Sequence, residues 1–191
     1  MEMLKARIAE LKDELIALRR DFHAHPELGF QEFRTASVIE QYLQDLGLET
    51  ARMAGTGVVA LINGQEEKPV LMLRADMDAL PICEVTDVDY CSCTEGVMHA
   101  CGHDAHMAML LVAAKVLVEN QDHLRGTVKL VFQPNEEING ARDMIRAGVL
   151  EDPRVDAAFG LHIWSQLPSG TVGAAPGPVM GGLDVFKLVI R

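Results

Sequence analysis

The stretch VMHACGHDAHMAMLL, residues 97–111, places three histidines, one cysteine and one aspartate within eight positions, and an apolar run follows at once. The apolar run predicts a helix over residues 106–120 that packs in a core. Thiolate, imidazole and carboxylate groups together suit zinc or another late divalent metal. The stretch therefore predicts a metal-binding loop held by a core helix, whose N-terminus favours nearby negative charge, including a thiolate.

On both sides of this helix, short apolar runs alternate with helical patterns. The predicted strands are residues 57–64, 69–75, 126–133 and 155–163, and the other predicted helices are residues 4–22, 32–47 and 140–150. This alternation predicts an α/β fold with a mixed, largely parallel sheet flanked by helices. The Gly- and Pro-rich residues 169–182 are predicted to form a strand and then a hinge-like connection, and residues 183–191 alternate like a further strand.

The composition argues against two classes of partner. The 191 residues carry a formal net charge of −11, which disfavours nucleic acid and anionic membrane surfaces. The charged N-terminus lacks the apolar region of a signal peptide, and no apolar run approaches a membrane span. We therefore expect a cytoplasmic protein with neither nucleic-acid nor membrane partners, whose four cysteines are thiols or metal ligands rather than disulfides.

Polar side chains gather where the predicted strands end. They are Asp76 and Asp78 after the second strand, Glu136 and Glu137 after the third, and His162 at the end of the fourth. Sheets of this kind bind ligands at the carboxyl ends of their strands, so we expect these residues to converge with Cys101 and His103. Of two adjacent glutamates, one can bind a metal while the other takes a proton from water.

Each residue alone has an ordinary structural explanation. Asp76 and Asp78 are also typical turn residues, and Asp104 is a typical helix N-cap. In a metal site, Asp76 and Asp78 could hold a metal-binding histidine in the correct tautomer. His99 and His106 are expected to support the site rather than to bind metal. The conjunction of the clusters, each at an element end, favours the metal site.

Five stretches of the chain resemble the dinuclear-metal aminoacylase and carboxypeptidase superfamily. The match is to its amidohydrolase branch, which includes hippurate hydrolases, indole-acetyl-amino-acid hydrolases and N-acetyl-diaminopimelate deacetylases. The stretches are RRDFHAHPELGFQEFRTA (19–36), LRADMDALPI (73–82), GVMHACGHDAHMAMLLVAAKVL (96–117), GTVKLVFQPNEE (126–137) and FGLHIW (159–164). Together they span most of the chain and are specific.

The resemblance implies a role for each residue of the predicted site. The implied metal ligands are Cys101, His103, Glu137 and His162; the implied general base is Glu136, and the implied supporting carboxylate is Asp78. It also implies two divalent ions per complete site, from Zn, Mn, Co or Ni. The implied reaction is hydrolysis of the amide bond in small N-acyl amino acids, either hippurate-like or N-acetylated.

Members of this branch continue beyond the region matched here, into a lid or dimerisation domain and a last metal-binding histidine. The resemblance therefore implies that residues 1–182 are the N-terminal part of the catalytic domain and residues 183–191 the first strand of the lid. It implies a homo-oligomer at full length and weak or absent turnover by the 191-residue form.

The alternative is a non-catalytic module with a structural zinc site. Its ligands would be drawn from Cys83, Cys91, Cys93, His99, Cys101 and His103. Such a site has no need of Glu136, which distinguishes the two hypotheses.

Overall fold

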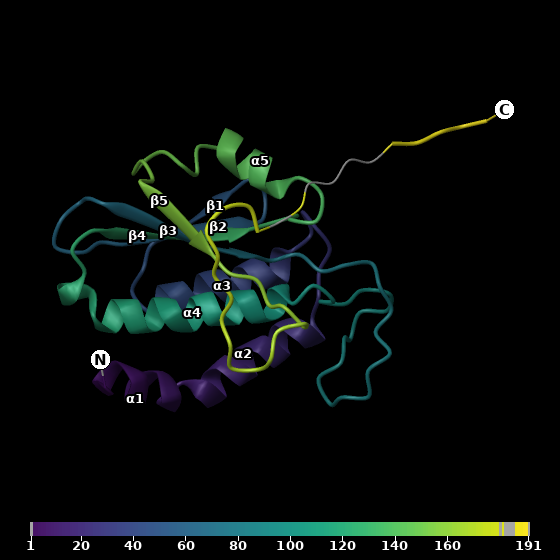
Figure 1. The fold of residues 1–191 in the computed structure, drawn as a ribbon, viewed down its shortest axis with the longest axis horizontal. Helices are drawn as coiled ribbons and strands as arrows, with labels where there is room; N and C mark the ends of the chain where they lie inside the picture. The colour runs from purple at the N-terminus through teal and green to yellow at the C-terminus, as the bar shows by residue number, and fades with distance from the viewer. Residues whose placement is uncertain (1, 180, 182–185, 191) are drawn as a thin grey trace.

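The computed structural model describes residues 2–179, 181 and 186–190. Its strands are β1 (Thr50–Met53), β2 (Gly57–Ile62), β3 (Val70–Asp76), β4 (Thr127–Gln133) and β5 (Ala157–Gly160). Its helices are α1 (Glu2–Glu10), α2 (Lys12–Ala24), α3 (Phe33–Asp45), α4 (His103–Glu119) and α5 (Gly140–Arg146), with a short 3₁₀ turn, η1 (Gln121–His123). Figure 1 shows α2, α3 and α4 beneath the sheet and α5 above it.

The strand order in the sheet is β1-β2-β4-β3-β5. β3 is parallel to both β4 and β5, whereas β2 is antiparallel to β1 and β4. The predicted α/β fold with a mixed sheet flanked by helices is confirmed, with parallel pairing confined to the β4-β3-β5 half. In that half Asp76 is level with Gln133, so β3 and β4 end at the same edge of the sheet.

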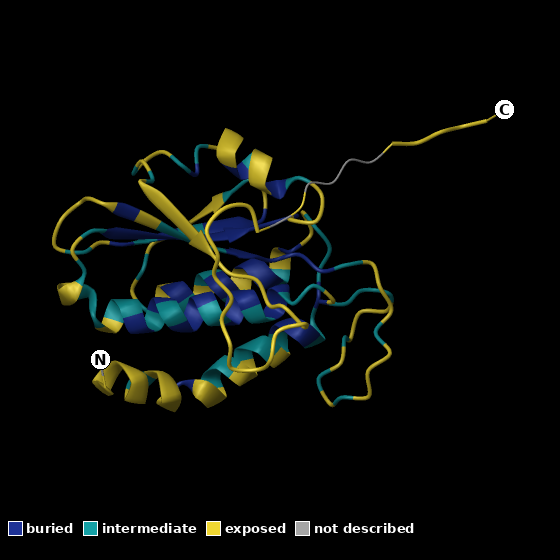
Figure 2. Ribbon diagram, in the orientation of Figure 1, coloured by how far each residue is buried: buried dark blue, intermediate teal, exposed yellow. Residues whose placement is uncertain are grey.

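The main core lies between the sheet and the layer of α2, α3 and α4. β4 is buried along its whole length, and alternate residues such as Leu130 and Phe132 face these helices. α4 packs between the sheet and α2, so most of its surface is in contact with other elements and most of its residues are apolar. Figure 2 shows this buried centre against an exposed α1 and β5. The start of α4 is thereby held rigidly against the sheet.

Three local expectations differ from the structure. The predicted helix over residues 4–22 breaks at Leu11, which is buried against Val112 and Val116 of α4. β1 was not predicted because it is a short edge strand in which no residue is buried. The strand predicted at the start of residues 169–182 is wrong: within residues 169–179 and 181 the chain is exposed and forms no strand, because no neighbouring strand pairs with it there.

The predicted lid strand is only partly covered by the structure. Residues 183–185 and 191 lie outside the described residues, and residues 186–190 are exposed and form neither helix nor strand. The boundary between residues 182 and 183 stays a prediction. Among the described residues, no helix has both the length and the apolar character needed to cross a membrane.

Candidate metal centre

The sequence-predicted residues meet at the edge of the sheet where β3, β4 and β5 end, beside the start of α4. His103 is at the centre of this group. Its Nε2 atom lies 3.9 Å from a carboxylate oxygen of Glu136 and 3.9 Å from one of Glu137. Its ring centroid is 6.4 Å from that of His162, whose Nε2 is 3.4 Å from the Cys101 sulfur. Segments far apart in the sequence thus share one small volume.

The two ring nitrogens of His103 differ in their surroundings. Nδ1 lies 2.8 Å from the backbone carbonyl oxygen of Asp78, which can only accept a hydrogen bond. Nδ1 therefore carries the hydrogen, and in the neutral ring Nε2 keeps its lone pair. Nε2 is buried and has no hydrogen-bond partner. An unpartnered buried acceptor of this kind is what a metal ion would satisfy.

Three overlapping groups of side chains could hold a metal ion, and all of them contain His103. They are Cys101, His103 and His162; Asp76, His103 and His106; and His103, Glu136 and Glu137. In each group the possible ligand atoms lie within 4.8 Å of one another. One thiol, several imidazoles and several carboxylates suit zinc, cobalt or manganese, so the residues present fit the divalent metal that the sequence predicts.

The site concentrates negative charge. Burial raises the pKa of the Cys101 thiol to about 12, with further increases from Glu137, Asp76 and Glu136. Burial also raises the pKa of Glu136; the charges of Asp76 and Glu137 add to this increase, whereas those of Arg74 and His103 oppose it without cancelling the effect of burial. Both shifts express the cost of another negative charge at this place. A bound cation would remove that cost.

The pKa of His103 is also raised, but for an imidazole a raised pKa favours the charged form. Burial alone would lower the pKa of its ring, but the contact of Nδ1 with the Asp78 carboxylate, at 3.3 Å, and the charges of Asp76 and Asp78 raise it overall. The same surroundings that retain a proton on the ring would also retain a metal cation, since both bind the Nε2 lone pair.

Asp78 contacts two of the predicted ligands. Its carbonyl oxygen holds His103, and its carboxylate accepts a hydrogen bond of 3.2 Å from the backbone N–H of Glu137. The Oδ1 atom of Asp78 also lies 3.3 Å from Nδ1 of His103, so both the backbone and the carboxylate of this aspartate orient the predicted ligand. Burial would raise the pKa of the Asp78 carboxyl group, but its contacts with the His103 ring and with the backbone N–H groups of Glu136 and Glu137 lower it overall.

Asp76 lies closer to His106 than to the predicted metal ligand His103. Its carboxylate lies 2.6 Å from Nδ1 of His106, within hydrogen-bond distance, but 3.7 Å from Nε2 of His103, which is too far for a hydrogen bond. Nε2 of His106 accepts a hydrogen bond of 2.9 Å from the backbone N–H of Ile163, the neighbour of His162. His106 therefore ties β3 to the segment that carries His162.

Asp104 does not cap the helix as predicted. α4 begins at His103, and the residue before it, Gly102, adopts a left-handed conformation with φ of 87°. Asp104 lies in the first turn, where its buried carboxylate is 2.7 Å from Nδ1 of His23 and 2.9 Å from Nε of Arg19. Its role is to join α4 to α2.

The described residues do not bring together the ligands of the alternative, structural zinc site. Cys83, Cys91 and Cys93 are exposed, and none of the candidate metal groups among the described residues contains them. His99 is buried and belongs to none of these groups either. The groups that do form include Glu136, which a structural zinc site does not require.

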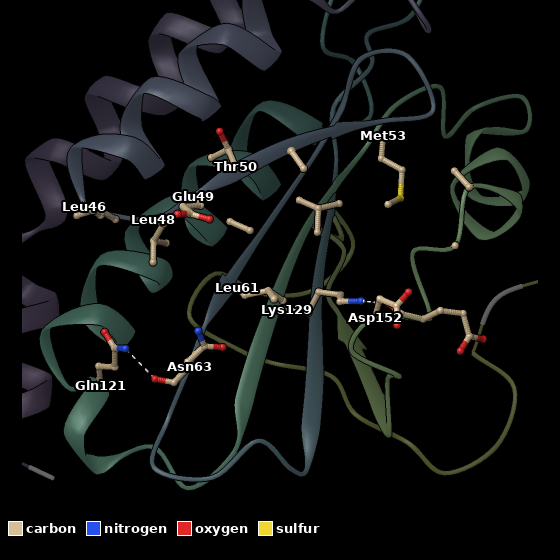
Figure 3. A pocket seen from close by; sticks show the side chains of 17 residues that line it. Leu46, Leu48, Glu49, Thr50, Met53, Leu61, Asn63, Gln121, Lys129 and Asp152 are labelled. Atoms are coloured by element: carbon tan, nitrogen blue, oxygen red, sulfur yellow. Dashed lines mark hydrogen bonds between the residues drawn. The ribbon is translucent and has the colours of Figure 1, made fainter.

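A hollow lies on the α5 face of the sheet, away from these residues (Figure 3). Lys129 is one of the residues that line it. Its ammonium group donates hydrogen bonds to the backbone carbonyls of Val149, Glu151 and Pro153, at 3.0, 2.5 and 2.9 Å. All three protons of the ammonium group therefore have partners. Lys129 anchors the turn after α5, and this hollow offers no cluster of metal-binding side chains among the described residues.

Comparison with known protein families identifies the chain. The model of peptidase family M20/M25/M40 matches residues 72–186, more than half of the sequence. The chain belongs to this family. The resemblance drawn from the sequence motifs is thus confirmed, and the matched segment contains every predicted site residue of this M20 chain.

Individual M20 relatives agree with this assignment. The chain is 45% identical over its whole length to thermostable carboxypeptidase 2 of Saccharolobus solfataricus, of which it covers 49%. It is also 45% identical, over 99% of its length, to the N-acyl-L-amino acid amidohydrolase of Geobacillus stearothermophilus, of which it covers 51%. The chain spans about half the length of the curated relatives it matches.

A solved structure supports the M20 fold directly. The Bacillus subtilis YXEP protein, described as a dinuclear metal binding peptidase from the M20 family, superimposes with a TM-score of 0.85 and is 45% identical in sequence. The match covers 89% of this chain and 48% of that protein.

Proposed function

We propose that this chain acts as a metal-dependent amidohydrolase that cleaves the amide bond of N-acyl amino acids. The observation that carries the proposal is the buried, unpartnered Nε2 of His103, which faces a thiol, a second imidazole and two carboxylates. The N-acyl-L-amino acid amidohydrolase relative supports the substrate class.

In this proposal the metal is held by four side chains, Cys101, His103, Glu137 and His162, which come from the ends of β4 and β5 and from the start of α4. A divalent ion bound there supplies Lewis-acid polarisation of the amide carbonyl. Asp78 fixes the tautomer of His103 and the backbone direction of Glu137, so two of the four side chains are positioned by one residue.

Glu136 is proposed as the general base. Its side chain is 38% exposed, the most open of the two glutamates, so water and substrate can reach it. Its raised pKa makes it a stronger base than an ordinary glutamate. Glu136 takes the proton from the attacking water and then gives it to the amine nitrogen as the carbon–nitrogen bond breaks.

The remaining expectations belong to the same proposal. We infer two ions per complete site, a small N-acyl amino acid as substrate, cytoplasmic placement and a homo-oligomer at natural length. The dinuclear description of the YXEP protein supports the ion count. Elemental analysis and light scattering on protein purified without a chelating tag measure the ion count and the oligomeric state.

The test compares wild type with Glu136→Gln at the natural length of the chain. After loading with Zn, Mn or Co, hydrolysis of N-acetyl and N-benzoyl amino acids is measured, with unblocked dipeptides as the comparison substrate. We expect Glu136→Gln to lower kcat by about 10²–10⁴-fold while the metal content stays unchanged. Glu66→Gln, at an exposed glutamate away from the site, is the control. Wild-type rates in Glu136→Gln would reassign the base, and failure of metal-loaded wild type to cleave N-acyl amino acids would refute the function.

A further inference from the structure

The segment between α2 and α3, residues 25–32, touches two of the loops that form the candidate metal centre, those after β3 and β4. The backbone N–H of Ala79, next to Asp78, donates to the carbonyl of Glu27 at 2.8 Å, and Leu28 forms a bridge with Ala79. At the other end of the segment, Glu32 reaches the loop after β4. This segment belongs to the matched stretch RRDFHAHPELGFQEFRTA, to which the proposed chemistry assigns no role.

Glu32 is a completely buried carboxyl group, with 0% of its surface exposed. One oxygen accepts a hydrogen bond of 2.9 Å from the backbone N–H of Asn135, and the other accepts one of 2.5 Å from the hydroxyl of Thr56. Burying a carboxyl group is unfavourable unless its hydrogen bonds compensate. Here both oxygens accept hydrogen bonds, one from the loop after β4 and one from the end of the turn that precedes β2.

The conformation of Asn135 is restrained by contacts of both its backbone and its side chain. Its φ of 48° lies in the left-handed region, which is uncommon for a residue with a side chain. Its carbonyl accepts hydrogen bonds from the backbone of Asn139 and Gly140, at 3.1 and 2.7 Å, where α5 begins. Its side chain lies over Gly29, where a Cβ atom would be 2.0 Å from the Asn135 amide oxygen. The Glu32 contact completes this set of restraints.

The next two residues along the chain are Glu136 and Glu137. We propose that Glu32, supported by Thr56, is a positioning residue that sets the direction in which these two carboxylates leave the Asn135 turn. Asp78 restrains the same loop from the other side, through the backbone of Glu137. This inference rests on the proposed function for the roles of the two glutamates, but it is read out in metal binding as well as in turnover.

Four variants separate positioning from general stability. Glu32→Ala removes both acceptors, whereas Glu32→Gln keeps an oxygen for the N–H of Asn135 and is the conservative rescue. Thr56→Val removes only the supporting hydroxyl and is milder, so it serves if Glu32→Ala does not fold. Val58→Ala, in the fully buried part of β2, lowers stability without touching the loop and is the matched control.

The first measurement is binding of Co²⁺ and Zn²⁺ to each variant, by competition with a chromophoric chelator and by the visible spectrum of Co²⁺. We expect Glu32→Ala to weaken affinity by about 10–100-fold, the usual effect of losing a group that orients a ligand, and to change the Co²⁺ spectrum. Thr56→Val should follow in the same direction with a smaller change. Glu32→Gln should stay near wild type, and Val58→Ala should be unchanged.

The second measurement is turnover at saturating metal. Small misplacement of a reacting group can lower the rate by up to about 10²-fold, so kcat should fall in Glu32→Ala with little change in KM. If wild type hydrolyses no N-acyl amino acid but the metal readout responds as expected, the proposed function fails and the positioning role stands. If folded Glu32→Ala or Thr56→Val binds metal and turns over as Val58→Ala does, the positioning role is refuted.

Discussion

Lys129 and His103 are both buried polar side chains beside the same sheet, yet their surroundings are opposite. Lys129 faces the α5 side, where three backbone carbonyls accept its three protons (Figure 3). His103 stands at the carboxyl edge, where only one of its two nitrogens has a hydrogen-bond partner. Burial or charge alone would not distinguish the two.

The comparison separates a buried polar group whose partners all lie within the protein from one that keeps an atom without a partner. A buried group with every partner inside the protein has nothing left to offer, so its contribution is to stability. A buried group that is held on one side and has no partner on the other keeps an atom available to a ligand. Burial lowers the pKa of Lys129, while the pKa of His103 is raised, because carboxylates surround the histidine.

The largest expected effect is on metal binding by His103→Ala. All three candidate metal groups contain this residue, so its loss should remove more affinity than the ~10–100-fold associated with an outer supporting group. Isothermal titration with Zn²⁺ and elemental analysis measure the change. Lys129→Met is the matched control and should bind metal as wild type does. Retention of metal by His103→Ala would break the comparison.

The next effect is on the stability of Lys129→Met. Methionine keeps the length of the side chain but donates to none of the three carbonyls. Each buried carbonyl left without a donor costs about 1–3 kcal/mol, so the free energy of unfolding should fall clearly. Urea unfolding of the metal-free protein measures it. An unchanged midpoint would show that water replaces the ammonium group and that Lys129 is not a structural anchor.

A smaller effect is expected on the pH dependence of the free energy of unfolding, through Asp76 beside the candidate metal centre. Burial would raise the pKa of Asp76, but the hydrogen bond from His106 and the charges of Arg74 and His103 lower it from 3.8 to about 2. Because the folded pKa lies below the unfolded one, Asp76 stabilises the fold above pH 4, and this contribution is lost as the pH falls through about 2. It amounts to about 2 kcal/mol.

The measurement is urea unfolding of metal-free wild type and Asp76→Asn between pH 6 and pH 2. The variant should be less stable near neutral pH, and the difference should shrink toward pH 2. A difference that does not change with pH would show that Asp76 acts through shape alone and not through its charge.

Much of the fold was predictable because its signals are local. β2, β3 and β4 are short apolar runs with turn residues at their ends, and α3 and α4 carry helical patterns, so each appears where the pattern predicts it. β1 and the break at Leu11 were missed because they depend on pairing with β2 and on packing against α4. The wrong strand within residues 169–182 shows the converse, since a strand needs a neighbour as well as a suitable composition.

The sequence by itself determined which kinds of side chain stand at the ends of which elements, because residue type and hydrophobic period are both properties of short segments. It therefore predicted a metal centre around Cys101, His103, Glu136, Glu137 and His162. Only the tertiary structure decided that Asp78 orients His103, that Asp76 holds His106, and that Glu32 holds Asn135. These contacts join residues 25 to 103 positions apart, and hydrogen bonds of that kind depend on atomic distances that no local pattern specifies.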